Sequence, residues 1–491
     1  MIGRARADWL IVPILLAAAA LRLGSAGYSL WFDEIAAVRF AEQPLELLWS
    51  GWMAREANPP LYYTLLKGWI ALFGSSDLAV RALSVLIGIM GIGAAWWLAR
   101  RIGGRGAGLA AAALLAVSTA HLDYSQEVRG YILAHSAALF GCIAMVAYLD
   151  RPRIAPLAGY VVAALVALYA HTTMVVFVAL ANAAMLWLLR GDRRALVRWL
   201  AANLIVGLLW SWWAWISLGQ AGASSSTFGW IARPGVAQAL EMTGVVYLPF
   251  YIAGEKVAML PVLALAWLGG WAWFAVRERR PAVVLLAVLA LGAPLLLWGL
   301  SQKLPIFLPR TLFWAAGPMA VLVALVRMRS VPVHTALLGL LLLLELGATL
   351  RWLPMRETEA WPQAIAAADA ADPDAVLLVE GDAMGVAARH YLAQRGSRLR
   401  LMVLTPEVAS DRWANGLAGA PHVDAAGARA LLARERRVFV LIRGDYDPGR
   451  VLAPGGVAQP FYGTTGKRQP GLSLWRAHQP SPFVSSVVEK R

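Results

Sequence analysis

Three carboxylates follow the first apolar segment of the chain at a spacing that could support catalysis. Asp33 and Glu34 are adjacent and come directly after a Trp-Phe pair, which is typical of the lipid–water boundary. Glu56 lies two residues before Asn58 and a Pro-Pro pair, whose fixed φ angles exclude helix at that point. A carboxylate held on stiff backbone can orient or deprotonate an attacking hydroxyl or amine. We therefore expect a reaction site within residues 28–63.

Cationic side chains recur in later segments that would lie on the same side of a membrane. Arg129 follows Glu127 in a polar stretch between two apolar segments, and Lys303 and Arg310 flank two prolines. A planar guanidinium can hold a phosphate through two hydrogen bonds. Arg81 lies one turn inside an apolar segment, where it could reach lipid headgroups, pair with a loop carboxylate or bind an anion. These four cations are candidates for phosphate binding.

The elements that must position these residues are membrane helices. Of the 491 residues, 59% are apolar and 15% are charged, whereas soluble domains have about 25% charged residues. Long apolar segments with few charged residues lie at about 9–27, 78–99, 107–120, 131–149, 154–170, 172–190, 199–218, 257–276, 282–300, 311–326 and 331–350. Only helices satisfy their backbone polar groups within one span, so we expect a polytopic α-helical membrane protein with about 11 spans.

Arginines in the loops between these segments set the orientation. They cluster on one side, which the positive-inside bias assigns to the cytoplasm. The N-terminus is then cytoplasmic. Residues 61–76 form a helix that either lies in the outer interface or enters the membrane and returns, since a span there would invert every later loop. All the candidate residues above share the outer face. His171 is expected as a turn residue between two spans on that face. We expect a multi-pass protein of the bacterial inner membrane.

The composition changes after residue 350 to that of a soluble domain. Strand patterns at 375–380, 398–404, 437–442 and 472–475 alternate with helical patterns at 383–393 and 425–435. This alternation predicts a small α/β domain with a partly parallel sheet on the outer side. We therefore expect two domains, a transmembrane catalytic domain at 1–350 with its first outer loop at 28–77, and an extracytoplasmic α/β domain at 351–491. The glycines after the first strand make no dinucleotide fingerprint.

The net charge of +15 comes largely from the cytoplasmic arginines. It indicates membrane orientation and contact with lipid headgroups, and the pattern offers no folded basic face for nucleic acid. The single cysteine, Cys142, lies within a span, so an intrachain disulfide and a cysteine-based metal site are excluded.

Five short motifs occur in order over about residues 1–330. They are Trp31-Phe32-Asp33-Glu34, Asn58-Pro59-Pro60-Leu61-Tyr62-Tyr63, Arg81-Ala82-Leu83-Ser84, Ser125-Gln126-Glu127-Val128-Arg129-Gly130-Tyr131 and Pro309-Arg310-Thr311-Leu312-Phe313. With them the chain resembles the GT-C glycosyltransferases of the protein O-mannosyltransferase and aminoarabinose-transferase superfamily, of the family 39 type. The resemblance implies transfer of a sugar from a polyprenyl-phosphate carrier to an acceptor on the non-cytoplasmic face.

The resemblance also implies roles for individual residues. Asp33 corresponds to the catalytic acid/base, with Glu56 as second candidate and Glu34 positioning sugar hydroxyls or the loop. Asn58 occupies the position where the family has His or Lys, so this chain has an uncharged side chain there in place of a cation. Cations to hold the phosphate are Arg129, Arg310, Lys303 and Arg81, and residues that support the first loop and the donor site are Asn58, Tyr62, Tyr63, Gln126, Glu127 and Tyr131.

The carrier is itself activated, so no nucleotide and no cofactor is expected. A divalent metal held by Asp33 and Glu34 is possible but not favoured. Partners are the lipid-linked donor, an acceptor lipid, glycan or protein, and membrane lipids. One alternative is an oligosaccharide ligase with similar topology. Another is a lipid-linked sugar transporter or flippase, which predicts polar residues deep in several spans, where Glu345 is the exception to an otherwise apolar pattern.

Overall fold

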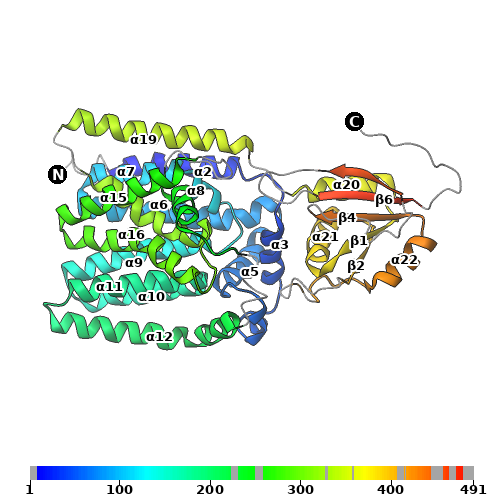
Figure 1. Ribbon diagram of the computed structural model, residues 1–491, viewed down its shortest axis with the longest axis horizontal. Coiled ribbons are helices and arrows are strands. Elements are labelled where there is room, and N and C mark those ends of the chain that lie inside the picture. Colours follow the sequence, from blue (N-terminus) through cyan, green and yellow to red (C-terminus); the bar gives the residue numbers. More distant parts are fainter. Residues whose placement is uncertain are drawn as a thin grey trace. The chain divides into compact units, whose positions relative to one another are not determined.

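The computed structural model describes residues 8–222, 231–248, 258–326, 330–355, 359–405, 414, 416–443, 457–463 and 472–478 (Figure 1). The chain forms two compact units. The first unit contains Met1–Gly27 and Gln43–Met355, and the second contains Tyr28–Glu42 and Arg356–Arg491. The second unit thus includes residues 28–42, which the sequence analysis placed in the transmembrane domain. The reason is tertiary packing, because the Tyr391 hydroxyl accepts the backbone N–H of Leu30 at 2.6 Å.

The first unit is a bundle of apolar helices, and each of the eleven predicted spans contains one (Figure 1). Their bounds are α2 Ile11–Gly24, α6 Asp77–Gly103, α7 Arg105–Val117, α9 Tyr131–Asp150, α10 Ile154–Ala170, α11 Val175–Leu188, α12 Arg193–Gly222, α15 Leu260–Glu278, α16 Pro281–Ser301, α18 Ala316–Leu325 and α19 Val331–Trp352. Within the described part of the chain, six helices are long and apolar enough to cross a membrane, namely α6, α9, α12, α15, α16 and α19. The predicted multi-pass membrane fold is confirmed.

Exposed apolar side chains show which surfaces of the bundle need lipid. On α12, Leu204 and Leu208 are each 64% exposed, and on α19 Leu343 is 68% exposed. Large aliphatic side chains at this density on one helix would be unfavourable in water, so a bilayer must cover them. By contrast, 78% of the most apolar 18-residue stretch of α9 is buried, which places α9 inside the bundle.

Shorter elements join the membrane helices and carry several candidate residues. They are α4 Leu45–Leu48, η2 Gly51–Arg55, α5 Leu61–Phe73, α8 Thr119–Tyr124, η3 Thr172–Met174, α14 Val236–Tyr247, α17 Pro309–Leu312, η4 Phe313–Ala315 and η5 Leu353–Met355. Helix α5 begins after Pro60 and ends at Gly74, whose φ of +82° suits glycine. This helix matches the predicted interfacial helix in extent, and its position at the outer interface stays a prediction.

The second unit contains one mixed sheet. Its strands are β1 Val376–Glu380, β2 Arg400–Leu404, β3 His422–Val423, β4 Val438–Arg443, β5 Val457–Gly463 and β6 Leu472–His478, and its helices are α3 Phe32–Ala41, α20 Trp361–Ala371, α21 Gly381–Arg395 and α22 Ala425–Arg434. The strand order is β3-β2-β1-β4-β6-β5. The first four strands are parallel, with Leu378 paired to Met402 on one side and to Val440 on the other, and β6 and β5 run antiparallel. The predicted small α/β domain is confirmed.

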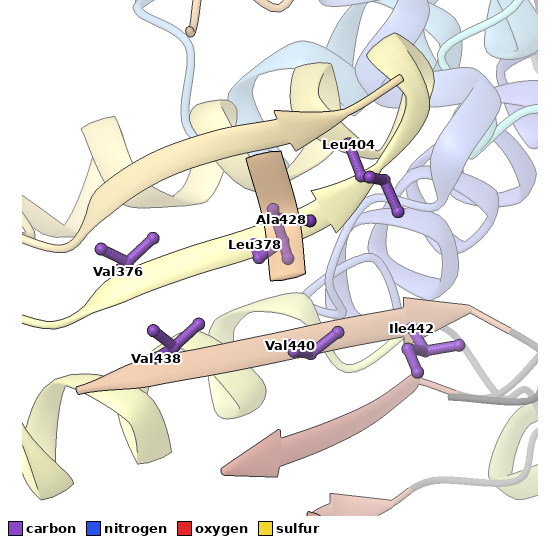
Figure 2. Packing of buried hydrophobic residues seen from close by; sticks show 7 residues of the cluster. All are labelled: Val376, Leu378, Leu404, Ala428, Val438, Val440 and Ile442. Carbon is purple, nitrogen blue, oxygen red and sulfur yellow. The ribbon is translucent and has the colours of Figure 1, made fainter. Parts of the chain in front are cut away.

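Alternating residues of the parallel strands make the core under one face of this sheet (Figure 2). The cluster comprises Val376, Leu378, Leu404, Ala428, Val438, Val440 and Ile442. Ala428 comes from α22, which crosses over between β3 and β4 as parallel strands require. Successive strand residues point to opposite faces, so the other strand positions face the opposite layer.

We expect Leu378→Ala to destabilise the second unit. Leu378 is fully buried in this cluster, and removal of a buried leucine side chain costs about 2–5 kcal/mol. Hydrogen–deuterium exchange at the β1 and β4 amides should then rise about tenfold or more. Leu337→Ala in α19 is the control, because Leu337 is exposed in the first unit and should leave this exchange unchanged. Unaltered exchange in Leu378→Ala would contradict the described core.

Candidate functional site

The predicted site residues lie in both units. In the first unit a buried carboxylate gathers four donors. Glu56 Oε1 accepts hydrogen bonds from Asn58 Nδ2 at 2.7 Å, Tyr63 Oη at 3.1 Å and Arg129 Nη2 at 3.4 Å, and Asn58 also donates its backbone N–H at 3.2 Å. Arg129 Nη1 donates to Tyr63 Oη at 3.2 Å. We call Glu56, Asn58, Tyr63 and Arg129 the Glu56–Arg129 cluster.

Burial makes this cluster rigid. Glu56 and Arg129 are each 7% exposed, and a charge so far from water must be paired and hydrogen-bonded. The ion pair between Glu56 and Arg129 satisfies both charges. Because Glu56 Oε1 already has four donors, we expect Glu56 to hold Arg129 and Asn58 in place rather than to take a proton from an acceptor.

Local sequence explains how the backbone brings Glu56 and Tyr63 together. Helix η2 ends at Arg55, so Glu56 is extended, and α5 begins directly after Pro60. The first turn of α5 therefore directs Tyr63 back to the Glu56 carboxylate. Gln220 of α12 fixes the same segment, since its Nε2 donates to the Glu56 carbonyl at 2.7 Å.

Arg129 lies in a loop between α8 and α9 that is tied to its neighbours on two sides. Ser84 Oγ donates to the Glu127 carbonyl at 2.7 Å, and the Tyr62 hydroxyl lies 2.6 Å from Ser84 Oγ. On the other side Gly130 lies against Ala170, where a Cβ would collide with the Ala170 carbonyl oxygen. Only glycine allows this close approach, which places Arg129 beside the turn that follows Ala170.

That turn contains His171, which the sequence analysis treated as a turn residue. His171 Nδ1 accepts the backbone N–H of Thr173 at 3.2 Å and lies 2.8 Å from its hydroxyl. The proton of the neutral ring is therefore on Nε2. Burial, the Arg310 guanidinium and the Arg129 guanidinium lower the pKa of His171 to about 3. The ring of Tyr131 lies 5.3 Å from the His171 ring. His171 thus stays neutral at physiological pH as a hydrogen-bond donor.

Arg310 and Arg129 both lie within electrostatic range of the His171 ring, since both lower its pKa. Arg310 is in the first turn of α17 and is partly exposed. Lys303 is exposed in the turn that follows α16. Two guanidinium groups against the one carboxylate of Glu56 leave these three side chains with a net positive charge, which suits a phosphate.

Two other predicted residues tie the end of α2 to its neighbours. Arg81 is fully buried in α6, and its Nη1 donates to the Ala26 carbonyl at 3.1 Å. Of the three alternatives for Arg81, contact with lipid headgroups is therefore excluded, because the side chain turns into the bundle, and phosphate binding stays a prediction. Gln126 Nε2 donates to Ser25 Oγ at 2.8 Å and to the Arg22 carbonyl. Both contacts fix residues 22–26, directly before the acid-bearing segment.

In the second unit, Asp33 and Glu34 lie in the first turn of α3 and differ in their surroundings. Glu34 is fully buried, and its Oε2 accepts the backbone N–H of Trp31 at 3.1 Å. This bond satisfies one of the unpaired donors at the start of a helix, as in a capping box. Asp33 is partly exposed. Glu34 therefore fixes the helix start, and Asp33 is the more accessible carboxylate.

We expect acid to destabilise the protein in part through His171. Unfolding restores the ordinary pKa of 6.5, so between pH 6.5 and about 3 the unfolded chain binds a proton that the folded chain does not. Stability is then lost as pH falls through this window. His171→Gln removes this dependence, so its melting temperature should fall less between pH 7 and pH 5 than that of the wild type. His334→Gln, in α19, is the control and should follow the wild type. If the melting temperature of His171→Gln falls between pH 7 and pH 5 as much as that of the wild type, the lowered pKa of His171 would be contradicted.

Comparisons with known proteins give one family match and several similar folds. Residues 57–215 match the family Dolichyl-phosphate-mannose-protein mannosyltransferase. The fold is similar to that of ArnT from Cupriavidus metallidurans bound to undecaprenyl phosphate, with a TM-score of 0.62 and 15% identity over 95% of this chain and 98% of that chain. It is also similar to the apo Archaeoglobus fulgidus oligosaccharyltransferase, with a TM-score of 0.51 and 12% identity over 89% of this chain and 70% of that chain. No curated protein sequence matches the chain.

The segment that matches the family begins at residue 57 and includes Asn58, Tyr63, Arg129 and His171. The chain therefore has a fold similar to that of ArnT and of the oligosaccharyltransferase, and residues 57–215 of its first unit match the dolichyl-phosphate-mannose-protein mannosyltransferase family.

Proposed function

We propose that this protein moves a sugar from a polyprenyl-phosphate donor to an acceptor on the outer face of the bacterial inner membrane. The family match and the fold support a membrane glycosyltransferase with a lipid-linked donor. The observation that carries the proposal is the Glu56–Arg129 cluster, in which a buried carboxylate holds a guanidinium in one orientation beside Arg310 and a neutral His171. The ArnT structure with undecaprenyl phosphate supports a phosphate lipid as the ligand.

In the proposed reaction the leaving group is the polyprenyl phosphate. The bond between the anomeric carbon and the phosphate oxygen breaks, and its electron pair stays on that oxygen. Arg129 and Arg310 stabilise the negative charge that develops there, a preorganised electrostatic effect that is usually the largest catalytic contribution. His171 can donate Nε2–H to the same phosphate without changing its own charge. Lys303, which is exposed, is proposed as an outer cation for the approaching donor.

Asp33 is proposed as the base that receives the acceptor proton. The acceptor hydroxyl or amine attacks the anomeric carbon from the side opposite the phosphate, and its proton passes to the Asp33 carboxylate. This single displacement inverts the anomeric configuration. Glu34 holds the start of α3, and Glu56 holds Arg129, so neither is proposed to accept that proton. Tyr62, Glu127 and Tyr131 support the loop that carries Arg129.

The proposal needs no nucleotide, because the sugar phosphate bond is already activated. We also propose that no metal is required, and transfer should then persist after treatment with EDTA. The acceptor is a lipid, a glycan or a protein on the outer face. The N-terminus is proposed to be cytoplasmic and the second unit extracytoplasmic, as the loop arginines indicate.

Asp33→Asn tests the proposed base. The amide keeps the size of the side chain but cannot take a proton, so transfer should fall by about 10²–10⁴-fold. The assay incubates purified protein with a panel of radiolabelled polyprenyl-phosphate sugars and native membranes as the acceptor source, and measures label in the product. Binding of the donor should persist, since Asp33 is not proposed to hold the phosphate.

The control for this experiment is Asp77→Asn, which makes the same change in the first turn of α6 and should retain activity. Wild-type transfer by folded Asp33→Asn would remove Asp33 from the reaction. Loss of transfer in both variants would show that an aspartate at the start of a helix is needed for folding, and it would not support a specific role of Asp33 in the reaction.

A further inference from the structure

We infer that a buried ion pair of the second unit, Glu359 with Arg443, positions the acid-bearing segment 28–42 at the carboxyl edge of the sheet. The inference rests on the proposed function only in giving Asp33 a catalytic role, and the contacts stand without it. It assigns to the α/β unit the task of orienting a catalytic carboxylate, and to Glu359 and Arg443 the task of positioning residues.

The sheet topology shows why this edge can hold a ligand. Strand β1 has β2 on one side and β4 on the other, so the strand order reverses between β1 and β4. In open α/β sheets, ligands bind outside the carboxyl ends of the strands at such a reversal. Glu380 ends β1 and Arg443 ends β4, next to Ile442 (Figure 2). Here the chain's own segment is present, because the Arg443 guanidinium lies 4.6 Å from the centre of the Phe32 ring.

A small cavity lies at this edge among the described residues. Its volume is about 60 Å³, and Glu380, Met384 and Arg443 are among the residues that line it. The Arg443 guanidinium that lines this cavity is the one that packs on Phe32 of segment 28–42. The edge is therefore in contact with the acid-bearing segment.

Glu359 connects Arg443 to the start of the segment. Its Oε1 pairs with Arg443 Nε at 2.8 Å, and its carbonyl accepts the Ser29 hydroxyl at 2.6 Å. Its Oε2 accepts the indole N–H of Trp361 at 2.7 Å. The Glu359 side chain is fully buried, so the loss of Arg443 would leave a buried carboxylate without its cation.

Asp33 lies close enough to Glu359 to act on it electrostatically. Burial raises the pKa of Glu359, the Arg443 guanidinium and the Trp361 hydrogen bond oppose this effect, and the Asp33 carboxylate adds to it. Arg443 thus compensates a carboxylate that would otherwise repel Asp33. The same guanidinium also packs on Phe32, the residue directly before Asp33.

Further contacts fix the two ends of α3. Tyr391 Oη accepts the Leu30 N–H at 2.6 Å before the helix, and Arg39 Nε donates to the Leu417 carbonyl at 3.2 Å in its last turn. Ile35 and Ala36 are buried between these ends. A ten-residue helix held at its start, its end and along its face cannot rotate. The direction of Asp33 is therefore set by the second unit.

Substitution of the pair tests this inference. We expect Arg443→Gln to lower kcat by about ten- to a hundredfold, because misplacement of a catalytic group by about 1 Å can cost that much. The apparent KM for the donor should stay within about twofold, since the proposed phosphate residues belong to the first unit. Hydrogen–deuterium exchange at residues 30–42 should rise, while the β1 and β4 amides keep their protection. Arg443→Lys should recover part of the lost kcat, because it keeps the charge but not the planar contact with Phe32.

Glu359→Gln is the second variant, because the amide is isosteric and can keep the Trp361 hydrogen bond. If the two residues act as a unit, the double variant should be no worse than Arg443→Gln alone. Arg400→Gln is the matched control. It breaks the exposed pair of Arg400 with Glu435, at the start of β2, and should change neither kcat nor exchange.

The outcomes separate the inference from the proposed function. Unchanged exchange at residues 30–42 in both Arg443→Gln and Glu359→Gln would overturn the docking. Raised exchange with unchanged kcat would overturn the positioning role, whereas an inactive Asp33→Asn would still support the proposed base. An active Asp33→Asn would overturn the base while leaving the docking to be judged by exchange alone.

Discussion

Charges buried away from water must be paired, and this constraint fixes the positions of the residues that we propose for catalysis in both units. In the first unit Glu56 pairs with Arg129, and in the second Glu359 pairs with Arg443. Removing one partner of such a pair costs about 3–5 kcal/mol, because the other charge stays buried without compensation. Each pair therefore fixes the backbone segments that carry it. One fixed segment bears the proposed phosphate-binding cation, and the other bears the proposed base.

The two pairs differ in the groups around them. Burial and the guanidinium groups of Arg310 and Arg129 keep His171 neutral near the first pair. A neutral imidazole can donate to a phosphate without repelling the arginines beside it. Near the second pair, the Asp33 carboxylate acts on Glu359. These surroundings agree with the proposed role of Arg129 as a phosphate ligand and of Asp33 as a base.

Hydropathy and local periodicity were enough to predict the elements, because these signals lie within short stretches of sequence. Each predicted span contains a helix, and the strand patterns at 375–380 and 437–442 match β1 and β4. Strands β3 and β5 were missed. β3 has only two residues, and β5 contains Pro460, which cannot donate to a ladder.

The site was predicted in part, and the misses share one cause. The motifs pointed to Asp33, Glu56 and Arg129, but the pairing of Glu56 with Arg129 joins residues 73 positions apart. The docking of Leu30 on Tyr391 spans 361 positions. No periodicity or spacing encodes such contacts, so neither the packing of residues 28–42 in the second unit nor the contact of Arg81 with Ala26 was predicted. His171 was set aside as a turn residue, although its polar His-Thr-Thr sequence on the outer side was a usable signal.

We propose that Arg129, held by Glu56, binds the phosphate of a polyprenyl carrier. Equilibrium titration of the detergent-solubilised protein with undecaprenyl phosphate, the proposed product, tests this contact. We expect Arg129→Ala to weaken binding about tenfold or more and Arg129→Lys to weaken it less, because a charge-assisted bidentate contact is lost. Arg198→Ala, an exposed arginine of α12, should bind as the wild type does. Wild-type affinity in folded Arg129→Ala would contradict the claim.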